Sequence, residues 1–281
     1  MTQKIYEALK WASSYLTDNG RDANAGELVM KHVLQVNRAS MLARLHDVLS
    51  GEQEAAFQEM IHRHAHGVPV QHLIGTEEFY GRTFIVNRDV LIPRPETEEL
   101  VYHALEKGKR IPNPVIADIG TGSGAIAVTM KAERPDASVY AIDVSEAALA
   151  TAAQNAQSLH ADVMFLHGDL LKPLIEKGLM VDMLLSNPPY IPLNEKQTLS
   201  TVVVDYEPHL ALFGGQDGLD LYREMAAQLP FVLKKGGIAG VETGAGQTKA
   251  VAALFQAAFP DGKTEVIDDI NGKDRMVFLY V

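Results

Sequence analysis

Short apolar runs alternate with longer helical patterns over residues 115–281, and this alternation limits the possible folds more than any other feature of the sequence. Parallel strands need long crossover connections, which are usually helices. The pattern therefore predicts an α/β fold with a doubly wound, mostly parallel sheet that carries helices on both faces. The predicted strands are Val115–Ile119, Val139–Val144, Val163–Leu166, Val181–Leu185, Ile238–Thr243, Glu265–Ile270 and Met276–Val281, and the predicted helices are Gly124–Glu133, Ala147–Ser158, Leu219–Leu233 and Thr248–Phe259.

The last two predicted strands are joined through Asn271-Gly272, a dipeptide typical of tight hairpin turns. We therefore expect an antiparallel strand at the end of an otherwise parallel sheet. Ligands of such sheets bind beyond the carboxyl ends of the strands. Polar residues that directly follow the strands are the first candidates for a functional site.

The N-terminal part of the chain has a different character, because residues 1–66 show helical spacing and no strand pattern. Gly67-Val-Pro69 ends this region. We predict an all-helical domain over residues 1–70 and a linker over 71–95 that contains a β-hairpin around Gly81. The α/β domain then spans 96–281, and Leu91–Glu99, with prolines followed by acids, is typical of a helix start.

Charge and composition exclude several classes of protein. Residues 1–75 carry 7 basic and 8 acidic side chains, whereas residues 76–281 carry 18 and 28, so the larger part has a balance of −10 within a total of −11. Such a surface repels phosphate backbones, which disfavours direct binding of nucleic acid. There are no cysteines, which excludes disulfides and thiolate metal sites. No signal peptide and no apolar run of about 20 residues is present, so we expect a cytoplasmic protein without a membrane partner.

A glycine-rich loop, Asp118-Ile-Gly-Thr-Gly-Ser-Gly124, follows the first strand of the α/β part and opens a helix. It is a poor dinucleotide fingerprint, because Ala125 stands where a third glycine is needed, and it lacks the Lys-Ser/Thr of a P-loop. The pattern is similar to the first motif of class I S-adenosylmethionine (AdoMet) methyltransferases. That resemblance implies cofactor binding by Gly120, Thr121, Gly122, Ser123 and Gly124.

Two further strand ends carry acidic residues. Asp143 ends the second strand and is placed to accept hydrogen bonds from both ribose hydroxyls of a bound nucleoside. Asp169, after the third strand, is a candidate acceptor for an adenine amino group, with Leu170 against the ring. A plain turn explains Asp169 and Leu170 nearly as well.

The sequence Ser186-Asn-Pro-Pro-Tyr190 follows the apolar strand Val181–Leu185. Proline has no N–H for a sheet ladder, yet its carbonyl remains free, and the residue before a proline is held extended. Asn187 and Pro188 thus form a stiff pair of acceptors for a planar NH2 group, with Pro189 beside them and Tyr190 stacked on the group that bears it. Fixed carbonyl dipoles stabilise the positive charge that grows on the nitrogen during methyl transfer. We predict catalytic roles for Asn187, Pro188 and Tyr190, substrate binding by Asn187–Tyr190, and a cofactor contact for Asn187.

The Asn-Pro-Pro-Tyr tetrapeptide resembles the signature of amino-group methyltransferases. These include DNA adenine-N6 and cytosine-N4 enzymes and the HemK/PrmC-type glutamine-N5 methyltransferases. Leu91–Glu98, Tyr206-Glu-Pro208 and the helical N-terminal region resemble the HemK/PrmC family specifically. This resemblance implies methylation of the glutamine in the Gly-Gly-Gln motif of class I peptide chain release factors, docked partly by the N-terminal domain. Leu170 departs from the family pattern, in which some members carry an aromatic residue near adenine.

Two alternatives stay open, a nucleic-acid adenine methyltransferase and a non-catalytic AdoMet-binding protein. Gly214-Gly-Gln216 reproduces the expected substrate motif within the chain, but we interpret it as a turn before a helix. His62, His64 and His66 lack a third ligand at suitable spacing, so we expect no metal site.

Overall fold

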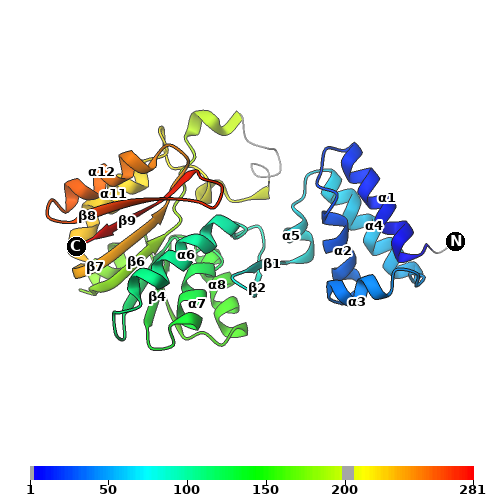
Figure 1. Ribbon diagram of the computed structural model, residues 1–281, viewed down its shortest axis with the longest axis horizontal. Coiled ribbons are helices and arrows are strands. Elements are labelled where there is room, and N and C mark those ends of the chain that lie inside the picture. The colour runs from blue at the N-terminus through cyan, green and yellow to red at the C-terminus, as the bar shows by residue number, and fades with distance from the viewer. Residues whose placement is uncertain (1–2, 198–205) are drawn as a thin grey trace. The chain divides into compact units, whose positions relative to one another are not determined.

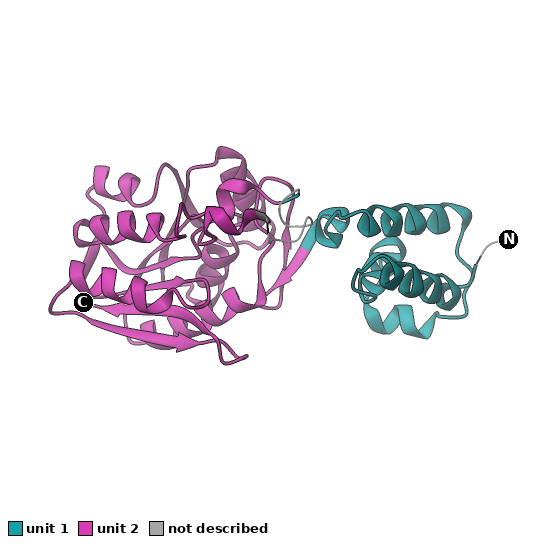
Figure 2. Cartoon of the chain, turned by 90° about the horizontal axis from the view of Figure 1, so that it is seen from above, with its two compact units in different colours: residues 1–76, 200–206 teal, residues 77–199, 207–281 magenta. Residues whose placement is uncertain are grey.

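A computed structural model describes residues 3–197 and 206–281. The chain divides into two compact units, one of residues 1–76 with 200–206 and one of residues 77–199 with 207–281 (Figure 2). Each unit has its own core of buried apolar side chains.

The N-terminal unit is helical, which confirms the prediction for this region. Buried Ile5, Ala8, Ala12 and Leu16 recur along one face of the first helix, which packs this face into the core. Ser50 caps the fourth helix by accepting a hydrogen bond from the Gln53 N–H. The helices are α1 (Ile5–Asp18), α2 (Ala25–Leu34), α3 (Arg38–Ala43), α4 (Gly51–Ala65) and α5 (Val70–Ile74).

The larger unit is built on a seven-stranded sheet with the order β5-β4-β3-β6-β7-β9-β8 (Figure 1). The strands from β3 to β7 run parallel, and β9 lies antiparallel between β7 and β8, as the Asn271-Gly272 hairpin predicts. A separate two-stranded hairpin turns at Gly81, again as predicted. The strands are β1 (Thr76–Phe79), β2 (Arg82–Ile85), β3 (Val115–Ile119), β4 (Ser138–Asp143), β5 (Val163–His167), β6 (Val181–Ser186), β7 (Leu233–Glu242), β8 (Lys263–Asp268) and β9 (Asp274–Tyr280).

Helices cover both faces of this sheet (Figure 1). Apolar side chains of α6, α7 and α8 enter one core, and those of α9, α11 and α12 enter the other. The observed arrangement confirms the predicted doubly wound fold with an antiparallel strand near its end. The helices are α6 (Pro95–Gly108), α7 (Ala125–Glu133), α8 (Glu146–Ser158), α9 (Lys172–Glu176), α11 (Asp220–Gln228) and α12 (Thr248–Ala258), with single 3₁₀ turns η1 (Leu193–Gln197), η2 (His209–Ala211) and η3 (Leu229–Phe231).

The prediction of one helix over Leu219–Leu233 and a strand from Ile238 is wrong at the junction. The helix ends at Gln228, because Pro230 cannot donate the next helical hydrogen bond and forms a 3₁₀ turn instead. Strand β7 begins earlier, at Leu233, which pairs with Val181 before a register shift. Leu233 is the last residue of the predicted helix, but in the structure it is the first residue of β7.

The order of the strands reverses at β3, which has β4 on one side and β6 on the other. Such a switch point leaves a crevice beyond the carboxyl ends of the two central strands. The Ser186 hydroxyl at the end of β6 donates a hydrogen bond of 2.7 Å to the Ile119 carbonyl at the end of β3. This bond ties the glycine-rich loop and the Asn-Pro-Pro-Tyr segment to one point of the sheet.

Candidate active site

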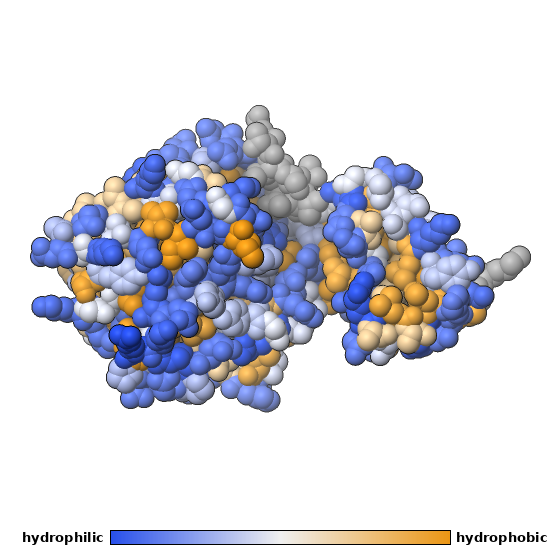
Figure 3. Space-filling view, viewed as in Figure 1, coloured by the Kyte–Doolittle hydropathy of each residue, from blue (hydrophilic) through white to orange (hydrophobic). Residues whose placement is uncertain are grey.

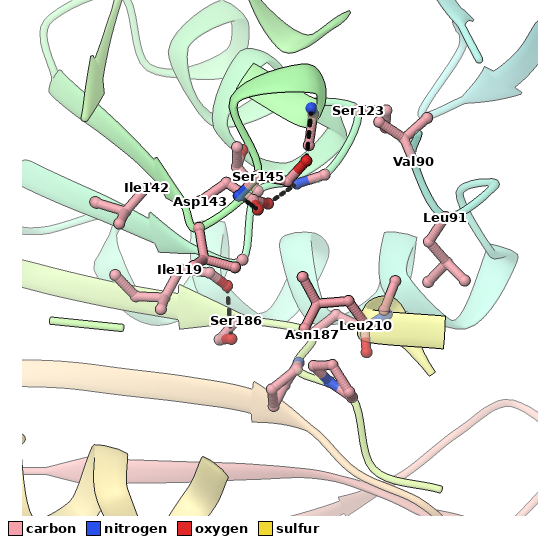
Figure 4. A pocket seen from close by; sticks show the side chains of 18 of the residues that line it. Val90, Leu91, Ile119, Ser123, Ile142, Asp143, Ser145, Ser186, Asn187 and Leu210 are labelled. Atoms are coloured by element: carbon pink, nitrogen blue, oxygen red, sulfur yellow. Dashed lines mark hydrogen bonds between the residues drawn. The ribbon is translucent and has the colours of Figure 1, made fainter. Parts of the chain in front are cut away.

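A cavity of about 280 Å³ lies at the switch point, entirely within the larger unit (Figure 4). Figure 4 shows the Ser186–Ile119 hydrogen bond at its base and side chains converging from several strand ends. Ten of the predicted site residues line this cavity. They are Gly120, Thr121, Gly122, Ser123, Asp143, Asp169, Leu170, Asn187, Pro188 and Pro189.

The glycine-rich loop turns sharply because three of its residues have left-handed backbones. Gly120, Gly122 and Gly124 have φ of +68°, +54° and +82°. An added Cβ at Gly120 or Gly122 would meet no protein atom within 4 Å, so both face open space. Gly124 does not line the cavity, and an added Cβ there would lie 3.0 Å from the Cβ of Ala152 on α8. The first two glycines thus admit a ligand, whereas the third lets two helices approach.

Asp118 lies beneath this loop and is completely buried. Its Oδ2 accepts hydrogen bonds from the Thr121 hydroxyl at 2.6 Å and the Ala127 N–H at 3.1 Å. Burial, with a smaller contribution from nearby Asp143, raises the pKa of Asp118 to about 7. Asp118 does not line the cavity, so it shapes the loop from behind rather than contacting a ligand.

Asp143 connects the loop to the end of β4. Its Oδ2 accepts a hydrogen bond from the Gly122 N–H, and its Oδ1 accepts one from the Ser145 N–H, both at 2.9 Å. Figure 4 shows Asp143 and Ser145 together at the cavity wall. Each carboxylate oxygen has a further lone pair available for a hydroxyl group in the cavity.

Asp169 and Leu170 lie where the chain leaves β5, and both line the cavity. Asp169 also forms an ion pair with Lys172, whose ammonium bonds Glu224 as well. The Asp169 carboxylate is therefore shared between the cavity and a surface ion pair. Its contact with an adenine ring stays a prediction.

A hydrogen bond from its amide nitrogen fixes the orientation of the Asn187 side chain. Nδ2 donates a hydrogen bond of 2.9 Å to the hydroxyl of Thr97 in the first turn of α6. Within the described ranges 3–197 and 206–281, the structure records no hydrogen bond to Asn187 Oδ1. Because Asn187 lines the cavity and its Oδ1 has no recorded partner within those ranges, this oxygen is a candidate acceptor for a ligand.

Tyr190 lies behind the other residues of its motif and does not line the cavity. Its ring packs against the buried core beside α11 and α12, and its carbonyl accepts a hydrogen bond from Gln247 at 2.9 Å. Burial raises the pKa of Tyr190 to about 12, so its hydroxyl stays protonated. Stacking of Tyr190 on a substrate stays a prediction.

Two contacts at this site were missed by the sequence reasoning. Thr97, which holds Asn187, donates a hydrogen bond of 2.7 Å to Glu242 at the end of β7. Arg94 forms an ion pair of 2.5 Å with Glu207, whose side chain is 2% exposed. The stretch Leu91–Glu99 predicted only a helix start, although its Arg94 and Thr97 each supply one partner of these contacts.

Gln216, His62, His64 and His66 all lie outside the cavity. Gln216 is exposed and lies outside the cavity, in the bend that precedes α11, which confirms the interpretation as a turn. The ring nitrogens of His64 and His66 bond the carbonyls of Val68 and His62. Among residues 3–197 and 206–281, no group of three His, Asp or Glu side chains is arranged to hold a metal ion.

Comparison with known proteins assigns a family to this geometry. Residues 7–75 match the model of the PrmC N-terminal domain, and residues 97–207 match the methyltransferase small domain. The release factor glutamine methyltransferase of Bacillus anthracis is 51% identical over 99% of both chains. Those of Bacillus subtilis and Staphylococcus aureus are 46% and 40% identical over 97% and 96% of this chain, and over 96% and 97% of their own lengths. The chain belongs to the release factor glutamine methyltransferase family.

Solved structures show the same fold at low sequence identity. A methyltransferase from Pyrococcus furiosus aligns with a TM-score of 0.53 and 17% identity, over 72% of this chain and 89% of its own. A Thermus thermophilus 16S rRNA methyltransferase, solved with AdoMet and guanosine, aligns with a TM-score of 0.50 and 16% identity. The alignment covers 73% of this chain and 49% of the other. The larger unit of this release factor glutamine methyltransferase family member therefore has the AdoMet-dependent methyltransferase fold. None of the described helices is long and apolar enough to cross a membrane.

Proposed function

We propose that this protein transfers a methyl group from AdoMet to the side-chain amide nitrogen of the glutamine in the Gly-Gly-Gln motif of class I peptide chain release factors. The observation that carries the proposal is the direction of the Asn187 amide. Its Nδ2 is engaged by Thr97, which leaves the carbonyl oxygen for a donor in the cavity. An amide NH2 is such a donor.

AdoMet fits the groups that surround the cavity. Gly120 and Gly122 leave open space beside the backbone, and Asp143 presents a carboxylate next to it. We propose that Gly120–Ser123 surround the methionine part, that Asp143 accepts the ribose hydroxyls, and that Asp169 and Leu170 border the adenine. When bound, AdoMet supplies an electrophilic methyl group on a sulfonium.

The chain's own contribution to the reaction is to orient and polarise the acceptor amide. The Asn187 carbonyl oxygen and the Pro188 carbonyl would accept the two hydrogens of the substrate NH2, with Pro189 beside them. This arrangement opposes delocalisation of the nitrogen lone pair and aims it at the methyl group. The same dipoles stabilise positive charge on nitrogen in the transition state. The proton leaves after the N–C bond has formed, so no general base is needed beforehand.

The helical unit is proposed to dock the release factor. Its surface exposes Tyr6, Leu42 and Val48, which are 40%, 40% and 57% accessible, and Figure 3 shows apolar areas on this unit. Removing residues 1–75 should reduce kcat/KM for whole release factor more than for a short Gly-Gly-Gln peptide. Equal losses on both substrates would contradict the docking role.

The decisive experiment offers labelled AdoMet with a release factor, with DNA, or with neither, followed by mass spectrometry of the modified residue. We expect one methyl group on the Gly-Gly-Gln glutamine. Because release factors act where translation ends, we also propose that the protein acts in the cytoplasm. Methylated adenine would instead support the nucleic-acid alternative, which the −10 balance of residues 76–281 disfavours. Label on Gln216 would reveal automethylation. Asn187→Ala should abolish transfer and leave AdoMet affinity intact.

A further inference from the structure

Three side chains form a continuous hydrogen-bond chain from the cavity into the protein interior. Asn187 Nδ2 donates to Thr97 Oγ1 at 2.9 Å, and the Thr97 hydroxyl donates to Glu242 Oε2 at 2.7 Å. Asn187 directly follows β6, Thr97 lies in the first turn of α6, and Glu242 ends β7. Thr97 and Glu242 are 5% and 1% exposed, so water does not compete for these bonds.

The direction of this chain depends on its last member. A carboxylate can only accept, so the hydroxyl of Thr97 must point to Glu242 and its lone pair must face Asn187. Thr97 then accepts from Asn187 Nδ2, and the Asn187 carbonyl is left for the cavity. A protonated Glu242 can instead donate to Thr97, whose hydroxyl would then seek the Asn187 carbonyl. That reversal turns the Asn187 NH2 toward the substrate NH2. Because both groups are donors, no hydrogen bond forms between them.

We propose that Thr97 and Glu242 are positioning residues for methyl transfer: ionised Glu242, acting through Thr97, keeps the Asn187 carbonyl directed at the substrate amide. The inference rests on the proposed function of Asn187 as an acceptor. Neither positioning residue needs to touch the substrate for this role. This role gives buried Glu242 a function, although Glu242 takes no direct part in the methyl-transfer step.

Glu242 lies in a mixed electrostatic environment. Burial is the largest influence and raises the pKa of Glu242 to about 7, while the Thr97 hydrogen bond opposes this rise. The Tyr222 hydroxyl donates a hydrogen bond of 2.7 Å to the Glu242 main-chain carbonyl and fixes the end of β7. The charged or titratable groups that act on Glu242 are Arg275 from β9, Arg94 and Glu96 at the start of α6, Tyr190 after β6 and Tyr222 from α11.

Protonation near neutral pH gives the proposal a kinetic signature. Because the pKa of Glu242 is raised, it gains a proton as the pH falls through about 7. We expect kcat at saturating AdoMet and peptide to fall below that pH. Glu242→Gln keeps the shape of the side chain but cannot titrate, so it should lower kcat and remove this acid limb.

Thr97 variants separate positioning from structure. Thr97→Val is nearly isosteric but breaks the chain, and we expect kcat to fall on the order of 10- to 100-fold, because small misplacements of a reacting group have such effects. AdoMet affinity should change less than twofold. Thr97→Ser retains the hydroxyl and should restore kcat to within about threefold of wild type. A kcat for Thr97→Val within twofold of wild type, with Asn187→Ala inactive, would overturn the inference and leave the proposed function standing.

A spectroscopic measurement decides the question without turnover. In protein labelled with ¹⁵N-asparagine, the Asn187 side-chain NH2 signal can be identified by its loss in Asn187→Ala. We expect its chemical shift to move with a midpoint near pH 7 in wild type and to stay constant in Glu242→Gln. A shift that moves equally in both would reject Glu242 as the controlling group. Failure of wild type to methylate the peptide would count against the proposed function alone.

Discussion

The three glycines of the glycine-rich loop, Gly120, Gly122 and Gly124, allow a prediction that separates folding from ligand binding. An alanine at Gly124 must adopt φ near +82°, and its Cβ would lie 3.0 Å from the Ala152 Cβ and 3.2 Å from the Ala152 Cα. The left-handed backbone costs about 1–2 kcal/mol. The contact with a helix backbone cannot be relieved by a rotamer change and adds about 1–3 kcal/mol. We expect Gly124→Ala to lower the free energy of unfolding by about 2–5 kcal/mol, the sum of the two costs.

Gly236 provides the matched control, because its φ of +79° is similar and an added Cβ would meet no protein atom within 4 Å. It lies on β7 and does not line the cavity. Gly236→Ala should therefore show the backbone cost alone, about 1–2 kcal/mol. Urea unfolding followed by circular dichroism measures both variants. Equal losses in Gly124→Ala and Gly236→Ala would refute the argument that Gly124 exists for helix packing.

Gly122→Ala completes the series. Its φ of +54° predicts a stability loss like that of Gly236→Ala, but its Cβ would enter the space beside the loop. We expect AdoMet to bind at least tenfold more weakly by calorimetric titration, whereas Gly236→Ala binds normally. Wild-type affinity in Gly122→Ala would remove this stretch of backbone from the proposed cofactor site.

Three further perturbations test other parts of the larger unit. Asp143→Ala removes a charged acceptor and should raise the Kd for AdoMet about 10- to 100-fold, as measured by titration calorimetry. Asp89→Ala, which removes another acid that lines the cavity, is the control and should change the Kd less. Arg94→Met leaves the buried Glu207 carboxylate without its partner and should cost about 3–5 kcal/mol in urea unfolding, most of which an added Glu207→Gln should restore. The pKa of Asp118 is raised to about 7, so the folded state keeps its proton between about pH 4 and 7 while the unfolded state loses it. The free energy of unfolding should accordingly fall as the pH rises over that interval, with up to roughly 4 kcal/mol contributed by Asp118. Asp118→Asn should show a smaller slope, because Glu242, whose pKa is also raised to about 7, still contributes; equal slopes in both proteins would contradict the assignment.

Much of the fold follows from local patterns that the sequence displays directly. Val115–Ile119 and Val181–Leu185 are short apolar runs with turn residues at their ends, and both form parallel strands of the central sheet. The carboxyl ends of parallel strands meet at one edge, so the glycine loop and Asn187 could be placed together from the sequence alone. Asn271-Gly272 likewise specified the final hairpin through turn chemistry.

The remaining features depend on long-range packing. Glu242 and Thr97 are 145 residues apart, and Arg94 and Glu207 are 113 apart, so neither pair has a local signal. Thr97 and Glu242 meet because α6 packs against β7, an arrangement that no local pattern fixes. Pro230 did carry a local signal, since a proline ends a helix, yet the apolar spacing around it favoured continuation.

The order of strands at the far side of the sheet has a consequence for how the chain folds during synthesis. Strand β9 follows β8 in the chain yet lies between β7 and β8, and it pairs with both. Until residues 274–280 have left the ribosome, β8 has no neighbour and β7 exposes an open edge to other chains. The end of β7 also carries Glu242, whose electrostatic neighbour Arg275 arrives with β9. Glu242, for which we propose a positioning role, thus gains its final electrostatic environment only when β9 is in place. If that proposal holds, we expect a nascent copy that lacks β9 to be inactive in methyl transfer.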